Sequence, residues 1–227
     1  MNKLISLAAA ALALLILAGC SAGSTVLPPH RTGAASLDVS LEQFYTLESA
    51  MEEADLVALV RIGSWIGETS EGTFTYYQAH VLKTFKGSTS EEIALVQDGN
   101  SVRSIAGFPL FTAGNEFLLF LKQGTGTEYA NFFWMLGSFT AFFDTVRDGK
   151  GTLYYMDRFG IIGSSVEGCE NFLFDTDKAG ELKQAAAKAD PEAERYRYHY
   201  IFSAGEMDPL LESLSAAAAE QTAEPEE

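Results

Sequence analysis

Residues 56–62 read LVALVRI and residues 74–85 read FTYYQAHVLKTF, and these two stretches decide the fold class. The first is a short run of branched and apolar residues, which is typical of a buried strand. The second is rich in aromatic and β-branched residues, which favour strands. Because the residues between them, 67–72, are turn-like, the two stretches predict a long antiparallel hairpin.

Shorter runs of the same character follow along the chain. The additional strands that they predict are residues 92–97, 116–122, 132–136, 138–146 and 152–156. Residues 148–151 (DGKG) are a good hairpin connection between the last two. Many short strands separated by glycine-containing turns predict a mainly β fold, a barrel or a sandwich, rather than alternating β/α units.

A short helix is predicted before the first strand. Ser40 with Gln43, or Ser49 with Glu52, fits the capping box that begins a helix. Apolar residues within 41–51 lie on roughly one side of such a helix, so this side should pack on the strands that follow.

Two further helices are predicted near the C-terminus. Residues 178–188 are rich in Ala, Leu, Lys and Gln, which favour helix. A second helix should begin at Pro209, with Asp208 as its cap, and end near Ala219. Both helices are expected to cover an open face or end of the barrel.

The order of these segments resembles the netrin-like type of OB barrel, the type found in tissue inhibitors of metalloproteinases. The residues that carry the resemblance are 54–60 (ADLVALV), 83–87 (KTFKG), 92–95 (EIAL) and 114–121 (GNEFLLFL). The resemblance spans about residues 54–122. It implies an antiparallel OB-like barrel, here with extra β-hairpins and peripheral C-terminal helices.

The inhibitory mechanism of those proteins is not carried over by the resemblance. In them, an N-terminal Cys chelates the zinc of the target, and disulfides hold that edge in place. This chain has two cysteines, and a tether separates Cys20 from the predicted barrel. A protease-inhibitor-like module is therefore an alternative reading rather than the preferred one.

The first twenty residues have the layout of a bacterial export signal. Lys3 provides a positive start, and residues 4–17 form an apolar run that is too short for a typical spanning helix. Residues 17–20 (LAGC) resemble the lipobox of bacterial lipoproteins. The resemblance implies cleavage before Cys20, acyl chains such as palmitate on its thiol, and anchoring at the extracytoplasmic face of the cell membrane. A secreted protein whose Cys20 is free or disulfide-bonded is the alternative.

The expected organisation has four parts. Residues 1–19 are the signal peptide, 20–35 the lipidated tether, 36–205 a single OB-like β domain with helical additions, and 206–227 a helix with an acidic disordered tail. The net charge of −16 repels phosphate backbones, so nucleic acid is excluded as a partner.

The sequence has no recognisable catalytic, metal or cofactor site. The histidines, His30, His80 and His199, lack the spacing of metal ligands. No nucleophile elbow or phosphate loop occurs. Cys169 has no partner if Cys20 is lipidated, and it is either a small buried apolar residue or a reactive thiol.

Arg195, Tyr196, Arg197, Tyr198 and His199 form the first candidate binding site. On a strand they would place the two arginines and the histidine on one face and the tyrosines on the other. The cationic face could then bind an anionic glycan or an acidic patch of a partner. Alternatively, the tyrosines pack on the barrel and the arginines pair with neighbouring acids.

The aromatic stretch from Tyr129 to Phe143 is the second candidate. It reads either as a platform for sugars, which OB barrels commonly offer, or as core, and burial is the preferred reading.

The sequence therefore predicts a membrane-anchored, non-enzymatic binding or interaction module of the cell envelope, with a protein or a glycan as its partner. The alternative is an envelope hydrolase with an unrecognised carboxylate site, for which Glu52 with Glu53 and Glu91 with Glu92 are the nearest candidates.

Overall fold

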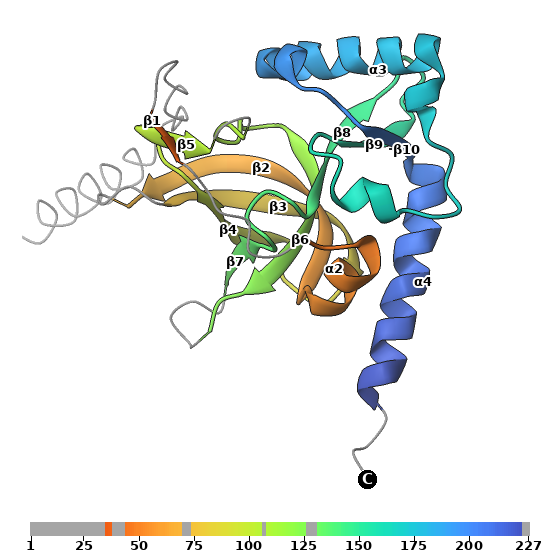
Figure 1. The fold of residues 1–227 in the computed structure, drawn as a ribbon. Helices are drawn as coiled ribbons and strands as arrows, with labels where there is room; N and C mark the ends of the chain where they lie inside the picture. Colours follow the sequence, from red (N-terminus) through yellow and green to blue (C-terminus); the bar gives the residue numbers. More distant parts are fainter. Residues whose placement is uncertain (1–34, 38–43, 70–73, 106–107, 126–130, 224–227) are drawn as a thin grey trace, which may run out of the picture.

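The computed structural model describes residues 35–37, 44–69, 74–105, 108–125 and 131–223. Most of their regular structure is β (Figure 1). The strands are β1 (Ala35–Leu37), β2 (Leu56–Glu68), β3 (Phe74–Lys86), β4 (Glu92–Asp98), β5 (Arg103–Ile105), β6 (Glu116–Gln123), β7 (Phe132–Met135), β8 (Phe142–Arg147), β9 (Leu153–Asp157) and β10 (Tyr200–Ser203). The helices are α2 (Leu47–Glu53), α3 (Thr176–Ala189) and α4 (Ala204–Ala223), with 3-10 turns η1 (Ile162–Ser165), η2 (Phe172–Phe174) and η3 (Pro191–Arg195).

Five strands close into a barrel. The main sheet has the order β10-β9-β8-β6-β2-β3-β4-β7, and an additional pairing of β6 with β7 closes the ring β6-β2-β3-β4-β7. The pairing of β4 with β7 is parallel and the other pairings in the ring are antiparallel. The predicted mainly β, OB-like barrel with peripheral helices is confirmed.

The strand β6 belongs both to the barrel and to the sheet outside it. Along one edge, its first half pairs with β8 at Phe117–Leu119 and its second half pairs with β7 at Leu121–Gln123. The chain passes from β7 to β8 through a corner at Gly137 and Ser138, which both have positive φ. The prediction of a strand over residues 138–146 was therefore wrong in its first part, because this corner delays the strand to Phe142.

The barrel interior is a packed core. In β3, buried and partly exposed residues alternate, so that Tyr77 and Ala79 point inward. They contact residues of the other ring strands, including Leu95, Phe117 and Phe133. The alternation is that of a strand with one buried face.

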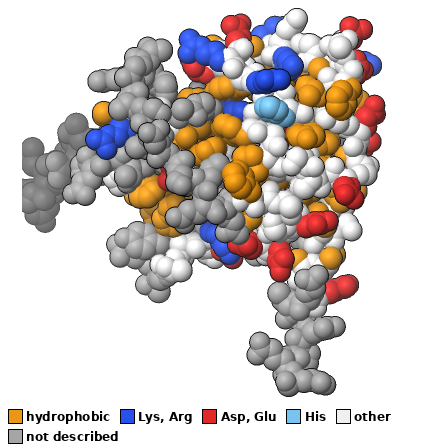
Figure 2. All heavy atoms as spheres, viewed as in Figure 1, with side chains coloured by type: hydrophobic (Ala, Val, Ile, Leu, Met, Phe, Trp, Pro, Cys, Tyr) orange, Lys and Arg blue, Asp and Glu red, His pale blue; other side chains and the backbone are white. Residues whose placement is uncertain are grey.

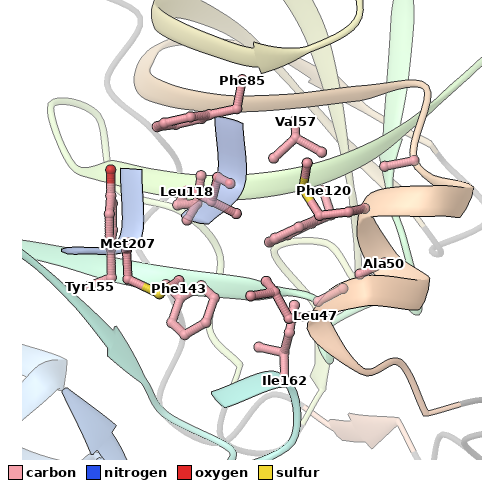
Figure 3. Packing of buried hydrophobic residues seen from close by; sticks show 14 of the residues in the cluster. Leu47, Ala50, Val57, Phe85, Leu118, Phe120, Phe143, Tyr155, Ile162 and Met207 are labelled. Atoms are coloured by element: carbon pink, nitrogen blue, oxygen red, sulfur yellow. The ribbon is translucent and has the colours of Figure 1, made fainter. Parts of the chain in front are cut away.

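A second core lies outside the ring, where α2 and α4 cover the strands (Figure 3). Leu47 and Ala50 of α2 face Phe120 and Phe143, and Met207 of α4 lies against the same cluster. These five residues are at most 2% exposed. The helices therefore add a layer to the barrel rather than closing its end.

The cap of α2 differs from the predicted one. The Thr46 side chain accepts a hydrogen bond from the Ser49 backbone, and the Ser49 side chain accepts one from Thr46. Ser49 is thus the third residue of the helix and not its cap, because Leu47 already turns into the core. The other predicted cap, Ser40 with Gln43, lies outside the described residues.

The helix α4 begins earlier than predicted. It starts at Ala204, directly after β10, and Pro209 lies inside it. The start is fixed by Met207 and Leu211, which are fully buried against the sheet. Pro209 is the sixth residue of α4 and has no N–H, so the carbonyl of Gly205, four residues before it, receives no intrahelical hydrogen bond from it. The expected limits of the β domain were residues 36 and 205. The first limit falls within β1 and the second within α4.

A third core joins α3 to the face of β8, β9 and β10 that lies opposite α4. The buried residues of α3 are Ala179, Leu182 and Ala186, and they contact Val146 and Met156 of the strands. Asp175 caps this helix by accepting from the Lys178 N–H. The predicted helix over residues 178–188 is confirmed, with slightly wider bounds.

Candidate functional site

The predicted lipidation residue, Cys20, lies outside the described residues, as do the signal peptide and almost all of the tether. Within the part of the chain that the structure describes, no helix combines the length and the hydropathy of a membrane span.

The predicted binding segment, Arg195–His199, is not a strand. Arg195 ends η3, residues 196–199 have no regular structure, and β10 begins at Tyr200. Tyr200 lies opposite Asp157, where β9 ends. The residues before Tyr200 extend beyond the end of β9. Among the backbone bonds of the described residues, only the His199 N–H connects this segment to β9, donating to the Asp157 carbonyl at 2.9 Å.

The expected separation of cations from tyrosines is nevertheless present. Arg195, Arg197 and His199 are exposed, whereas Tyr198 is buried and Tyr196 is partly buried. Arg195 forms an ion pair of 3.1 Å with Glu192. The pairing of Arg195 agrees with the alternative reading, but the tyrosines pack against α3 and the strands outside the ring rather than on the barrel.

The tyrosines enclose a buried ion pair that the sequence did not reveal. The ring of Tyr196 covers the guanidinium of Arg158, 3.6 Å from the ring centroid. Arg158 binds both carboxylate oxygens of Asp144, with Nε 2.9 Å from Oδ2. The two side chains are only 6% and 10% exposed. Burial alone would lower the pKa of the Arg158 guanidinium. The negative charge of Asp144 and its hydrogen bond more than offset this effect, so the pKa is raised.

The loop after β9 holds Arg158 in place. The Asp157 carboxylate accepts hydrogen bonds from the N–H groups of Phe159, Gly160 and Gly163, at 2.9, 2.8 and 2.7 Å. Burial raises the pKa of Asp157, and the three N–H groups act in the opposite direction. Because three bonds fix this turn, the backbone of Arg158 has little freedom.

A cleft of about 330 Å³ opens beside the ion pair, between the strands β6 and β8 on one side and α3 with η3 on the other. Its polar wall includes Arg158, Asp144, Tyr196, Tyr198 and Asp190. Its apolar wall includes the short side chains Ala185, Ala186, Ala189 and Ala193, together with Phe117 and Val146. The volume is at the lower end of the range for small-molecule sites.

Two of the three acids of the cleft are ion-paired with arginine. Glu116 is paired with Arg61 at 2.6 Å and with Arg147 at 3.4 Å, and Asp144 is paired with Arg158. Asp190, the third acid of the cleft, forms no ion pair within the described residues.

The two predicted acid pairs are surface groups. Glu52, Glu53, Glu91 and Glu92 are all exposed. In the described residues, no three metal-ligating side chains come together. Cys169 is partly buried. Burial is the larger cause that raises the pKa of its thiol, and the negative charge of the nearby Glu206 is the smaller one.

The second predicted stretch, Tyr129 to Phe143, divides between core and surface. Phe133, Phe142 and Phe143 are buried, as the preferred reading expected. Phe132 and Trp134 are partly exposed and alternate with Phe133, so they lie on the outside of the barrel. Tyr129 lies outside the described residues.

Phe132 and Trp134 form a patch with two neighbouring residues, Tyr76 of β3 and Val96 of β4. We call these four residues the outer aromatic patch. Strand register places Val96 between Tyr76 and Trp134. The ring of Phe132 lies 5.9 Å from that of Tyr76 and 6.3 Å from that of Trp134. Val96 is only 2% exposed although it lies on the outward face of β4.

Polar side chains border this patch. Gln78 lies on the same face of β3 and donates to Glu92 at 2.7 Å, and Glu92 also lies 3.2 Å from His80. On the opposite border, Lys122 lies opposite Trp134 and 3.6 Å from Asp55. Aromatic rings with hydrogen-bonding groups at their edges suit a ligand that is apolar on one face and hydroxylated at its rim.

Asp144 and Arg158 are the residues that sequence reasoning missed. The available signal was the turn at residues 148–151, which sets the register of β8 and β9. That register places Asp144 opposite Met156, and Arg158 follows on the same face.

Comparison of the chain with protein-family models, with curated proteins and with solved structures finds no match.

Proposed function

We propose that this protein is a membrane-tethered, non-enzymatic module that binds a glycan of the cell envelope across the outer aromatic patch. The observation that carries the proposal is the group of partly exposed rings, Tyr76, Phe132 and Trp134, on the outside of an OB-like barrel. Tethering rests on the lipobox-like residues 17–20.

The position of the patch supports a polymeric ligand. It lies on β3, β4 and β7, which are the second, third and fifth strands of the ring in chain order. OB barrels bind oligonucleotides and oligosaccharides across the face of their second and third strands. A face made of several strands can contact successive units of a chain.

The net charge of the molecule favours an oligosaccharide over an oligonucleotide as the ligand. The net charge is −16, and Figure 2 shows acidic side chains scattered down the side that carries α4. Such a charge repels a phosphate backbone. A glycan with few negative charges has no such barrier.

Sedimentation with insoluble peptidoglycan tests the proposal. We expect the purified chain to sediment with the polymer, and Trp134→Ala and Phe132→Ala each to weaken binding about tenfold or more, as truncating a central aromatic contact does. Phe174→Ala is the matched control, because Phe174 is 82% exposed and lies outside the patch. Circular dichroism establishes that each variant is folded. If the patch variants sediment as the parent does, or the parent does not sediment, glycan binding at this patch is wrong.

Mass analysis of the membrane-extracted protein tests the tether. We expect a mature mass that starts at Cys20 and includes acyl chains, and we expect the Cys20→Ala variant to lack them. Two or three chains hold a protein firmly on a bilayer, because each buried methylene contributes about 0.8 kcal/mol. A mass without lipid and two hydrogens lighter would instead indicate a disulfide between Cys20 and Cys169.

A further inference from the structure

The cleft beside Arg158 contains polar atoms whose hydrogen-bonding capacity is not used by the described residues. The Tyr196 hydroxyl is buried and has no hydrogen-bond partner there. Arg158 uses Nε and Nη2 on Asp144, and its Nη1 donates to none of the described residues. Buried polar groups are normally satisfied. A ligand or water in the cleft would satisfy both.

Asp190 adds an acceptor without a cation. One of its oxygens accepts from the Glu192 N–H. The other two acids of the wall, Glu116 and Asp144, are ion-paired with arginine, whereas Asp190 forms no ion pair within the described residues. Burial raises the pKa of Asp190. A cation at this position would offset the cost of burying the carboxylate.

The wall of the cleft carries one more acid than base. It carries the acids Glu116, Asp144 and Asp190 and the bases Arg147 and Arg158, so that 2 − 3 gives a net charge of −1. The rest of the molecule is acidic as well. An amine is therefore attracted where a carboxylate or a phosphate is repelled.

The apolar wall leaves room for a small ring. The side of α3 and η3 that faces the cleft carries only alanine side chains, at 185, 186, 189 and 193. Tyr198 is also part of the wall and gives it an aromatic surface. A compact ligand can therefore contact alanine and tyrosine carbon atoms while its polar atoms reach Asp190, Tyr196 and Arg158.

We infer that this cleft is a second binding site, separate from the outer aromatic patch, for a small hydroxylated amine such as an amino sugar. The amine pairs with Asp190. Hydroxyl groups donate to the Tyr196 oxygen and accept from Arg158 Nη1. The site is built by α3, η3, β8 and the start of β6, and the patch lies on β3, β4 and β7.

Calorimetric titration with three sugars tests the ligand class. The probes are glucosamine, glucose and glucuronate, at a pH at which the amine is protonated and the acid ionised. We expect glucosamine to bind, glucose to bind about tenfold or more weakly because it lacks the charged donor, and glucuronate not to bind. Glucuronate binding as tightly as glucosamine, or glucosamine giving no binding, would overturn the inference.

Three variants test the location. Asp190→Asn keeps a side chain that can cap η3 but removes the charge, so the affinities for glucosamine and glucose should become similar. Tyr196→Phe keeps the ring over Arg158 and should weaken glucosamine binding about threefold to tenfold. Because its hydroxyl has no partner, folding stability should not fall. Ala189→Trp fills the cleft from an exposed helix position and should abolish binding.

Trp134→Ala separates the two sites. It removes part of the outer aromatic patch, so glucosamine binding should be unchanged even if peptidoglycan binding is lost. Loss of glucosamine binding in Trp134→Ala, or undiminished binding in Ala189→Trp, would place the sugar outside the cleft and refute the inference.

Discussion

Breaking the ion pair between Asp144 and Arg158 should be among the most damaging single changes in this protein. In Asp144→Ala, the Arg158 charge stays buried without its partner, and removing one partner of a buried pair costs about 3–5 kcal/mol. In a domain of this size, 1 kcal/mol corresponds to about 2–4 °C in Tm. We therefore expect the free energy of unfolding to fall by about 3–5 kcal/mol and Tm by about 6–20 °C.

The pair of Arg61 with Glu116 provides the matched control. The Arg61 side chain is 49% exposed, against 6% for Arg158. Since exposed ion pairs contribute about 1 kcal/mol or less, Arg61→Ala should cost much less. Urea unfolding followed by tryptophan fluorescence measures both variants.

Replacing both members of the buried pair separates burial of a charge from loss of packing. In Asp144→Leu/Arg158→Met the unpaired charge is gone, so most of the stability lost in Asp144→Ala should return. If Asp144→Ala costs no more than Arg61→Ala, the argument that burial makes this pair important is wrong.

Three smaller perturbations test other parts of the structure. Gly160→Ala should destabilise by about 1–2 kcal/mol in urea unfolding, because Gly160 has φ +70° and a Cβ would lie 2.8 Å from His199 Cγ. Lys178 lowers the pKa of Asp148 to about 2, so this pair stabilises the fold above about pH 4 and its contribution is lost as the pH falls towards 2. In Lys178→Met this acid-dependent loss of stability should disappear, which unfolding at a series of pH values measures. Leu211→Ala should cost about 2–5 kcal/mol, read as a lower Tm, because Leu211 is fully buried between α4 and the sheet.

The barrel could be predicted because its strands are encoded locally. Each run, such as Leu56–Ile62, carries its own period and composition. The closing of the ring is different, because it needs the parallel pairing of β7 with β4, and β4 ends at Asp98 whereas β7 begins at Phe132. The corner at Gly137 and Ser138 was also missed, because the residues after it continue the aromatic run without a visible break.

The alternation in residues 195–199 correctly predicted that the tyrosine side chains lie on the side opposite the cationic ones. It did not predict the secondary structure of this segment. Tyr196 and Tyr198 turn inward because a buried guanidinium and an apolar helix face lie beneath them. That environment is supplied by Arg158 and α3, which no local pattern connects to this segment. Sequence reasoning therefore found two tyrosines of the cleft wall and missed the ion pair that makes the cleft polar.

The two faces of β8 and β9 explain why the cleft lies where it does. One face carries Phe143 and Tyr155 and is filled by α2 and α4 with large apolar side chains. The other carries Asp144, Val146 and Met156 and is covered by α3, whose contacting residues are mostly alanines. A charged pair at the edge of this second face cannot be packed by leucine or phenylalanine without losing its hydrogen bonds, and alanine leaves the space open. The cleft thus depends on α3 and η3 together with β8 and the start of β6, whereas the outer aromatic patch lies on β3, β4 and β7.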